Sequence, residues 1–144
     1  MNVQVGDTIG PWRNPAVDPA RMKTMALLLR DPNPIHFDVA TVQALGMGDA
    51  PVNQGPINVG FIMTMLGEWA GGLERVRRVR VRFFGNVFGG DAVVAGGTVR
   101  SITSGQAGSP GRVAECDVWL DADGRGRVVE GTAIVDIDGG GQIA

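Results

Sequence analysis

The segment from Pro56 to Trp69 restricts the possible folds more than any other part of the sequence. Its spacing is helical, but apolar side chains occur on nearly every side of the helix: Ile57, Val59, Phe61, Ile62, Met63, Met65, Leu66 and Trp69. A helix without a wide polar face has to be buried against other elements. The sequence therefore predicts a long, buried central helix, which ends at Gly71 and Gly72.

The apolar residues change their period after this helix. Runs rich in β-branched residues predict strands, and glycine-rich segments predict the connections between them. The strands are expected at 76–83, 93–102, 113–120 and 128–137, with connections at 85–90, 105–111 and 123–126. A first strand is expected near Val3 to Ile9. We predict an α+β fold with a curved antiparallel sheet of about five strands around the central helix, the last four strands joined as a meander.

The overall composition excludes several classes of protein. A length of 144 residues fits one domain, so we expect residues 1–144 to form a single unit. Thirteen basic and fifteen acidic residues give a net charge of -2, which provides no general electrostatic reason to bind nucleic acid. No signal peptide is visible, and no apolar segment reaches the ~20 residues that span a membrane. We expect a soluble, cytoplasmic protein without a membrane partner.

The reactive residue types are few. Cys116 is the single cysteine and His36 the single histidine, so the chain has no ligand set for a structural zinc. Cys116 is expected to pack as a small apolar residue. No glycine-rich phosphate-binding motif is present. The sequence predicts neither a metal nor a redox cofactor.

Two shorter helices are expected before the central one. Asp18 and Pro19 predict an N-cap and first turn for a helix that continues from Ala20 to Leu29. A second short helix is expected around Asp38 to Leu45, with Asp38 as its N-cap. Between them lies the segment DPNPIH (31–36), where two prolines predict a rigid, non-helical loop.

This loop contains the most unusual pair of side chains. On a helix, Asp31 and His36 would point about 140° apart, whereas the proline-rich loop allows them to converge. An ionised carboxylate and a neutral imidazole can together hold and deprotonate one water molecule, which is general acid–base chemistry. The spacing alone favours the alternative, a structural pair in which Asp31 caps or turns the chain and His36 is hydrogen-bonded in place.

Several motifs carry a resemblance to a known family. The runs DPNPIHFD (31–38) and RVRFFGNVFGGD (80–91), the glycine that opens the apolar helix, and the opening VGDTIG (5–10) resemble the MaoC-like hydratases and dehydratases of the hot-dog fold. These include the (R)-specific enoyl-CoA hydratases. The resemblance covers nearly the whole chain. It implies reversible syn addition of water to a trans-2-enoyl thioester, which gives the (R)-3-hydroxyacyl thioester.

The resemblance also implies roles for individual residues. Asp31 and His36 would activate the water and return its proton at the α carbon. The backbone N–H of Gly55, at the start of the central helix, would stabilise negative charge on the thioester oxygen; turn geometry is the alternative reason for this glycine. Asn33 matches the motif's asparagine, where bracing of the loop is favoured over contact with substrate.

The chain departs from the family at two positions. Gln54 stands where members commonly have histidine, and we expect it to affect the shape of the substrate pocket. Arg30 stands where they have glycine, and it can hold Asp31 ionised, contact the phosphate-bearing arm of the substrate, or face solvent. Arg82 belongs to a basic cluster that is either a solvated face or a binding site for substrate phosphates. The members of that cluster are Arg75, Arg77, Arg78, Arg80 and Arg82.

The expected substrate is an acyl-CoA or acyl-carrier-protein thioester. Two alternatives to the hydratase are a hot-dog thioesterase and a subunit that binds acyl thioester together with a partner chain. Proteins of this fold generally join two sheets edge to edge, and a small open sheet leaves edges for pairing. We therefore expect a homodimer, with a heteromeric hot-dog partner as the alternative.

Overall fold

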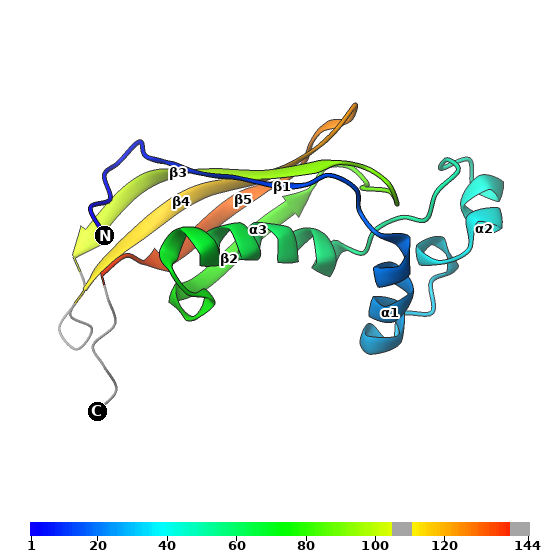
Figure 1. Cartoon of the computed structure of the whole chain (residues 1–144), viewed down its shortest axis with the longest axis horizontal. Helices are drawn as coiled ribbons and strands as arrows, with labels where there is room; N and C mark the ends of the chain where they lie inside the picture. The colour runs from blue at the N-terminus through cyan, green and yellow to red at the C-terminus, as the bar shows by residue number, and fades with distance from the viewer. Residues whose placement is uncertain (105–110, 139–144) are drawn as a thin grey trace.

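A five-stranded antiparallel sheet and one long helix form the two layers of the computed structural model, which describes residues 1–104 and 111–138. The strands are β1 (Thr8–Asn14), β2 (Val76–Phe83), β3 (Val93–Ser104), β4 (Arg112–Ala122) and β5 (Gly126–Asp136). The α-helices are α1 (Pro19–Leu29), α2 (Val39–Ala44) and α3 (Gly55–Ala70), and the 3-10 turns are η1 (Pro34–His36) and η2 (Leu73–Arg75). Figure 1 shows α3 along one face of the sheet, while α1, η1 and α2 project beyond one end. The predicted α+β architecture is confirmed.

The strand order corrects the predicted meander. In space the order is β1-β3-β4-β5-β2, so only β3, β4 and β5 follow one another as a meander. Strand β2 pairs with β5, with Val81 opposite Gly131, instead of with β3. The strands that flank the helical segment in sequence, β1 and β2, thus occupy opposite edges of the sheet. Apolar periodicity identifies a strand but does not specify its neighbour.

The predicted first strand is also shifted. It was expected near Val3 to Ile9, but β1 begins at Thr8 and continues to Asn14. Its pairing with β3 shifts register between Ile9 and Trp12, where Pro11 interrupts the strand. An edge strand tolerates a proline because one of its sides makes no ladder hydrogen bonds. The expected connection at 105–111 lies almost wholly outside the described residues.

The core lies between α3 and the concave face of the sheet. Phe61, Ile62, Met65 and Leu66 are the large buried apolar side chains of α3. Cys116 on β4 is fully buried among them, and burial raises the pKa of its thiol to about 12. The predicted packing of this cysteine as a small apolar residue is confirmed.

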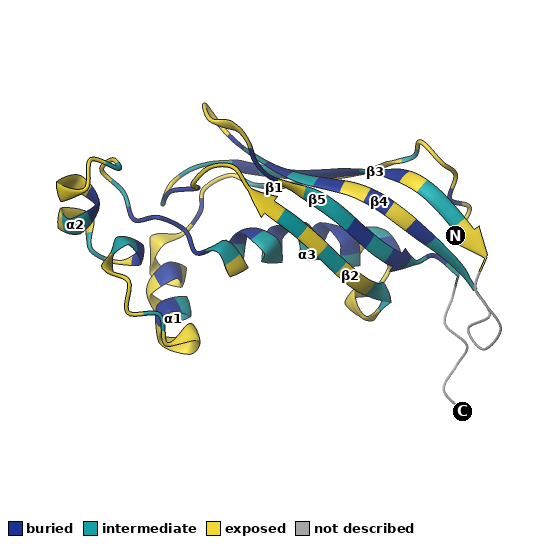
Figure 2. Ribbon diagram, turned by 180° about the vertical axis from the view of Figure 1, so that it is seen from behind, coloured by how far each residue is buried: buried dark blue, intermediate teal, exposed yellow. Residues whose placement is uncertain are grey.

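The predicted central helix is confirmed, and in the single chain only one side of α3 is buried. Val59, Met63 and Trp69 remain partly exposed, because the sheet covers only one side of the helix. Figure 2 shows buried segments both along α3 and along the strands of the sheet. Within the described ranges, no helix is both long and apolar enough to cross a membrane.

The short helices form where their caps predict. Oδ1 of Asp18 accepts a hydrogen bond from the N–H of Ala20 at 2.9 Å, which caps α1. Asp38 caps α2 in the same way, and the hydroxyl of Thr41, which donates to its carboxylate, lowers the Asp38 pKa. The loop at 31–36 contains one feature that was not predicted, the 3-10 turn η1, which Pro34 opens. A proline is tolerated there because the first residue of a turn needs no N–H donor.

Candidate active site

The loop after α1 brings Asp31 and His36 together. Nε2 of His36 lies 3.3 Å from Oδ2 of Asp31, and the Asp31 side chain is 33% exposed. The other carboxylate oxygen of Asp31 accepts the N–H of Asn33 at 3.1 Å, and Oδ1 of Asn33 accepts the N–H of Ile35 at 3.3 Å. Asn33 therefore holds the turn η1 with its side chain, and Asp31 keeps one oxygen available on the side of His36.

The second ring nitrogen of His36 fixes its tautomer. Nδ1 lies 2.7 Å from the carbonyl oxygen of Val52. A carbonyl oxygen can only accept, so Nδ1 carries the hydrogen and donates it. In the neutral ring, Nε2 then presents a lone pair next to the Asp31 carboxylate. Two adjacent acceptors with access to solvent are suited to bind one water molecule and to take a proton from it.

The chain from Val52 to Gly55 connects the pair to the start of α3. The N–H of Val52 donates to the carbonyl of Ile35 at 2.9 Å, so two hydrogen bonds join this segment to η1. Gly55 lies three positions after Val52 in the chain, which limits the distance between their Cα atoms to at most ~11 Å even in a fully extended chain. Val52 carries no signal in the sequence, because its contribution comes from the backbone and does not depend on the residue type.

Gly55 is the first residue of α3 and keeps a free donor. Its N–H has no acceptor among the described residues, and Pro56 has no N–H at all. The backbone of Gly55 does not have a positive φ, so turn geometry does not require glycine here. A Cβ at this position would lie 3.2 Å from Cζ of Phe83. The absent side chain leaves space beside an unpaired N–H at a helix N-terminus, where negative charge is stabilised.

Gln54 faces the protein interior instead of an open pocket. Its side chain is buried, and Nε2 donates to the carbonyl of Met22 on α1 at 2.8 Å. Its Oε1 is buried with no hydrogen-bond partner in the described structure. Gln54 directly precedes Gly55, so its hydrogen bond links the start of α3 to α1, the helix that leads to Asp31.

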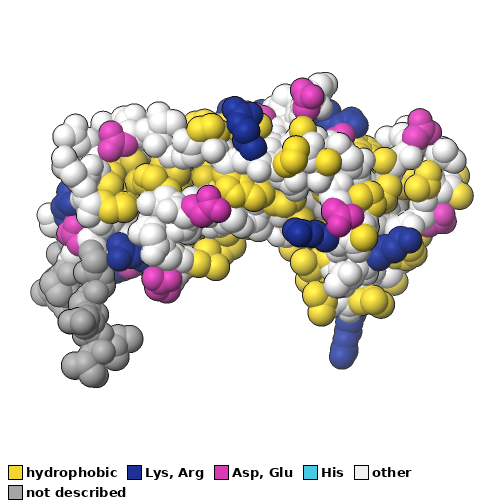
Figure 3. All heavy atoms as spheres, viewed as in Figure 1, with side chains coloured by type: hydrophobic (Ala, Val, Ile, Leu, Met, Phe, Trp, Pro, Cys, Tyr) yellow, Lys and Arg dark blue, Asp and Glu magenta, His cyan; other side chains and the backbone are white. Residues whose placement is uncertain are grey.

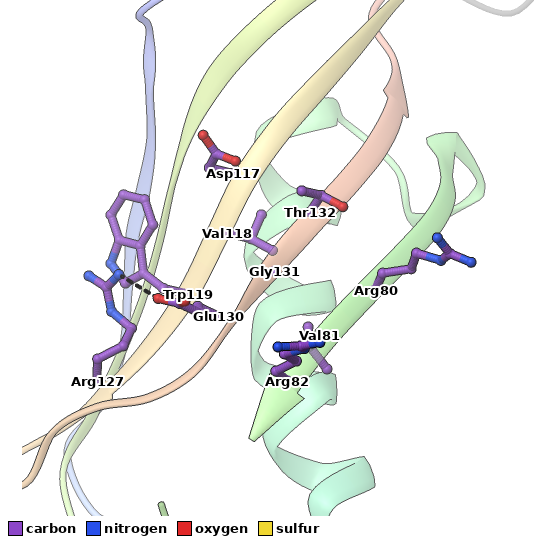
Figure 4. Close-up of a pocket in the computed structure, with 10 residues that line it drawn as sticks. All are labelled: Arg80, Val81, Arg82, Asp117, Val118, Trp119, Arg127, Glu130, Gly131 and Thr132. Carbon is purple, nitrogen blue, oxygen red and sulfur yellow. Dashed lines mark ion pairs between the residues drawn. The ribbon is translucent and has the colours of Figure 1, made fainter. Parts of the chain in front are cut away.

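The structure places Arg82 away from these residues. Arg78, Arg80 and Arg82 form one row, opposite Ile134, Thr132 and Glu130 of β5. Figure 4 shows Arg80 and Arg82 on the outer face of the sheet, with α3 behind it. They border a groove of about 670 Å³ that Trp119 and Arg127 also line. The next residue, Phe83, points to the opposite face and meets Gly55.

A second hollow lies directly beside Asp31. It has a volume of about 700 Å³ and combines apolar and charged side chains: Lys23, Ala26, Leu27, Arg30, Asp31, Pro32 and Phe37. The described part of the chain contains no group of three His, Cys, Asp or Glu side chains that would hold a metal ion.

Comparison with known proteins identifies the class of fold and then the family. The sheet order and central helix are those of the hot-dog fold, as in the structure of the (R)-hydratase from A. caviae involved in PHA biosynthesis. The two chains are 22% identical, with a TM-score of 0.80, and the alignment covers 96% of this chain and 99% of the other. The family model described as the MaoC like domain matches residues 2–115. The chain belongs to this MaoC-like family.

Two further solved structures share the fold. The ChsH1-ChsH2 complex from Mycobacterium tuberculosis has a TM-score of 0.77 at 21% identity, covering 96% of this chain and 100% of the other. The C-terminally truncated HadBC (3R-hydroxyacyl-ACP dehydratase) complex from the same organism has a TM-score of 0.72 at 16% identity, covering 94% and 99%. No curated protein sequence matches the chain.

Proposed function

We propose that this protein is a hydro-lyase that catalyses the reversible syn hydration of a trans-2-enoyl thioester to the (R)-3-hydroxyacyl thioester. The observation that carries the proposal is the 3.3 Å contact between Asp31 and His36, with the imidazole tautomer set by Val52. Membership of a family of dehydratases supports the reaction class. The similar structures include one described as an (R)-hydratase and one described as a 3R-hydroxyacyl-ACP dehydratase.

In the proposed reaction, Asp31 and His36 bind one water molecule between Oδ2 and Nε2. The water oxygen forms a bond to C3 of the enoyl group while the pair takes one of the water protons. The electron pair of the double bond moves toward the thioester carbonyl, whose oxygen gains negative charge. The pair then returns the proton to C2, which completes the addition of H and OH. Since one site delivers both groups, they arrive on the same face of the double bond.

Gly55 supplies the hydrogen-bond donor of the proposed site. Its free N–H donates to the thioester oxygen, and the contact strengthens as negative charge develops there. Asn33 and Gln54 already use their side chains in bonds within the chain, so we assign them to shaping the substrate site. Arg82 lies on the outer face of β2, so any contact with the substrate would involve a group far from the thioester.

We propose that the working unit is a homodimer. Both β1 and β2 are open edges of the sheet, and the outer side of α3 keeps partly exposed apolar residues. Such edges and surfaces favour pairing with a second chain. Two of the similar structures are described as complexes, ChsH1-ChsH2 and HadBC, which makes a different hot-dog chain the alternative partner. Light scattering on the purified protein tests the oligomeric state. A stable, active monomer of about 15 kDa would contradict both the homodimer and the heteromeric assembly.

The purified protein with crotonyl-CoA provides the test of the reaction class. We expect loss of the absorbance of the conjugated double bond with no release of free thiol. Release of thiol without hydration would identify a thioesterase instead. Hydration that appears only after a second hot-dog chain is added would identify a subunit of a heteromeric dehydratase.

A further inference from the structure

Arg30 has an unfavourable backbone conformation for its residue type. Its φ of 51° and ψ of 40° place it in the left-handed region, and no other described residue except glycine has a positive φ. Glycine is preferred at this position after a helix because a side chain is strained there. Strained residues other than glycine tend to be retained where the side chain has a function.

The Arg30 side chain borders the hollow beside Asp31. Lys23 lies seven residues earlier, two turns back on the same side of α1, and borders the same hollow. Neither Lys23 nor Arg30 has a side-chain hydrogen bond or ion pair with any described residue, Asp31 included. Two cations that have no partner among residues 1–104 and 111–138 are therefore available to a ligand that reaches Asp31.

The walls of this hollow are apolar. Leu27 of α1 is 81% exposed, and Phe37, the residue after η1, is 40% exposed. Such exposure is unusual for large apolar side chains. Figure 3 shows hydrophobic side chains gathered over the lobe that carries α1, with basic side chains close to them. The volume of about 700 Å³ is within the range of small-molecule sites. The chemistry fits an extended ligand with a methylene-rich body and an anionic end.

We infer that Lys23 and Arg30 bind the phosphate groups of the arm that carries the acyl thioester, while Leu27 and Phe37 contact the methylene groups of that arm. This assignment rests on the proposed hydratase function. The guanidinium of Arg30 forms paired, charge-assisted hydrogen bonds to phosphate oxygens, and the ammonium of Lys23 adds a second positive charge. Coenzyme A and a carrier-bound phosphopantetheine share this chemistry.

The test uses crotonyl esters of coenzyme A, 4'-phosphopantetheine and pantetheine, the last of which has no phosphate. In Arg30→Gly we expect KM for the CoA ester to rise about 10-fold, the scale of a lost charge-assisted contact, with KM for the pantetheine ester within about 2-fold. Arg30→Lys should have a KM for the CoA ester close to that of the wild type. Lys23→Met should raise this KM by a smaller factor than Arg30→Gly does. Arg21→Gln, an exposed arginine of α1 that does not border the hollow, is the matched control.

Thermal stability provides a second readout. Glycine relieves the left-handed strain, so the Tm of Arg30→Gly should be equal to or above that of the wild type. If Arg30 has only a structural role, the variant should have a lower Tm and the same rise of KM with all three esters. That result would overturn the assignment. A rise of KM in Arg82→Ala but not in Arg30→Gly would place the phosphates on the outer face of β2, which also overturns it.

Calorimetric titration with free coenzyme A separates this inference from the proposed reaction. If the wild type hydrates no enoyl ester but binds coenzyme A about 10-fold more tightly than Arg30→Gly does, the phosphate site stands and the hydratase function fails. If the wild type is an active hydratase and Arg30→Gly binds coenzyme A equally well, the function stands and the phosphate site fails.

Discussion

His36 and Val52 are joined by a 2.7 Å hydrogen bond from the imidazole Nδ1 to the backbone carbonyl. This one bond has two consequences. It assigns the proton of the neutral ring to Nδ1 and leaves the lone pair of Nε2 beside Asp31. It also ties the imidazole to the segment that leads directly into Gly55, so the base and the proposed oxyanion donor are positioned by the same stretch of backbone.

The first prediction concerns the two members of the pair. Asp31→Asn keeps the size of the side chain but removes its charge, so hydration of crotonyl-CoA should fall at least ~100-fold with little change in Tm. His36→Ala should lose activity to a similar extent. Since it also leaves the Val52 carbonyl without its donor, His36→Gln is the second variant to measure. Turnover near the wild-type rate in purified Asp31→Asn would rule out the assignment.

The second prediction concerns Gln54. Its bond to Met22 contributes about 1 kcal/mol, while the buried Oε1 without a partner costs about 1–3 kcal/mol. The cost equals or exceeds the gain, so Gln54 does not stabilise the fold, and we interpret it as a positioning residue between α1 and Gly55. Gln54→Met should keep the Tm within a few degrees or raise it, and lower kcat about 10-fold.

A spectroscopic readout distinguishes positioning from a general loss of structure in Gln54→Met. His36 is the only histidine, so its imidazole NMR signals are unambiguous. We expect these signals to shift in Gln54→Met while most backbone signals do not. An unchanged kcat together with unchanged His36 signals would show that the connection to α1 has no role in the site.

The third prediction concerns the space beside Gly55. The new Cβ in Gly55→Ala moves the thioester oxygen away from the Gly55 N–H, a contact that strengthens in the transition state, so kcat should fall more than the affinity for saturated butyryl-CoA does. Because the new Cβ also lies 3.2 Å from the Phe83 ring, the double variant with Phe83→Leu is the control. The decrease in kcat should persist in this double variant. Full recovery would instead assign Gly55 to clearance for Phe83.

The fourth prediction concerns Cys116. Its thiol is fully buried, and the pKa near 12 keeps it protonated at neutral and mildly alkaline pH. Because the thiolate is the reactive form, labelling by a thiol reagent at pH 8 should be at least ~100-fold slower in the folded protein than in urea. Labelling of the native protein at the unfolded rate would show that the core around β4 opens readily.

The sequence predicts those parts of the structure that depend on local signals. Asp18 and Pro19 define the start of α1 because a cap and a first-turn proline act on the adjacent backbone. The two prolines of the loop predict correctly that Asp31 and His36 can meet, since both residues belong to the same short segment. The strand β2 is predicted with its observed bounds, because its apolar and basic residues largely alternate.

Features that depend on distant parts of the chain are not predicted. The pairing of β2 with β5 depends on how the whole sheet assembles, and the burial of Gln54 against Met22 depends on where α1 packs. The role of the Val52 carbonyl has no side-chain signal at all. Arg30 is an intermediate case: the sequence shows an arginine where the family resemblance implies glycine, but its left-handed backbone and the hollow beside it are evident only from the structure.

The proposed role of Asp31 and His36 is to add water to one face of an enoyl thioester. Hydration of crotonyl-CoA in D2O, followed by analysis of the configuration at C2 and C3 of the product, tests it most directly. We expect the (R)-3-hydroxybutyryl thioester with one deuterium at C2, added on the same face as the new hydroxyl group, and no such product from Asp31→Asn. Deuterium distributed over both faces, an (S)-hydroxyl product, or equal product formation by Asp31→Asn would contradict it.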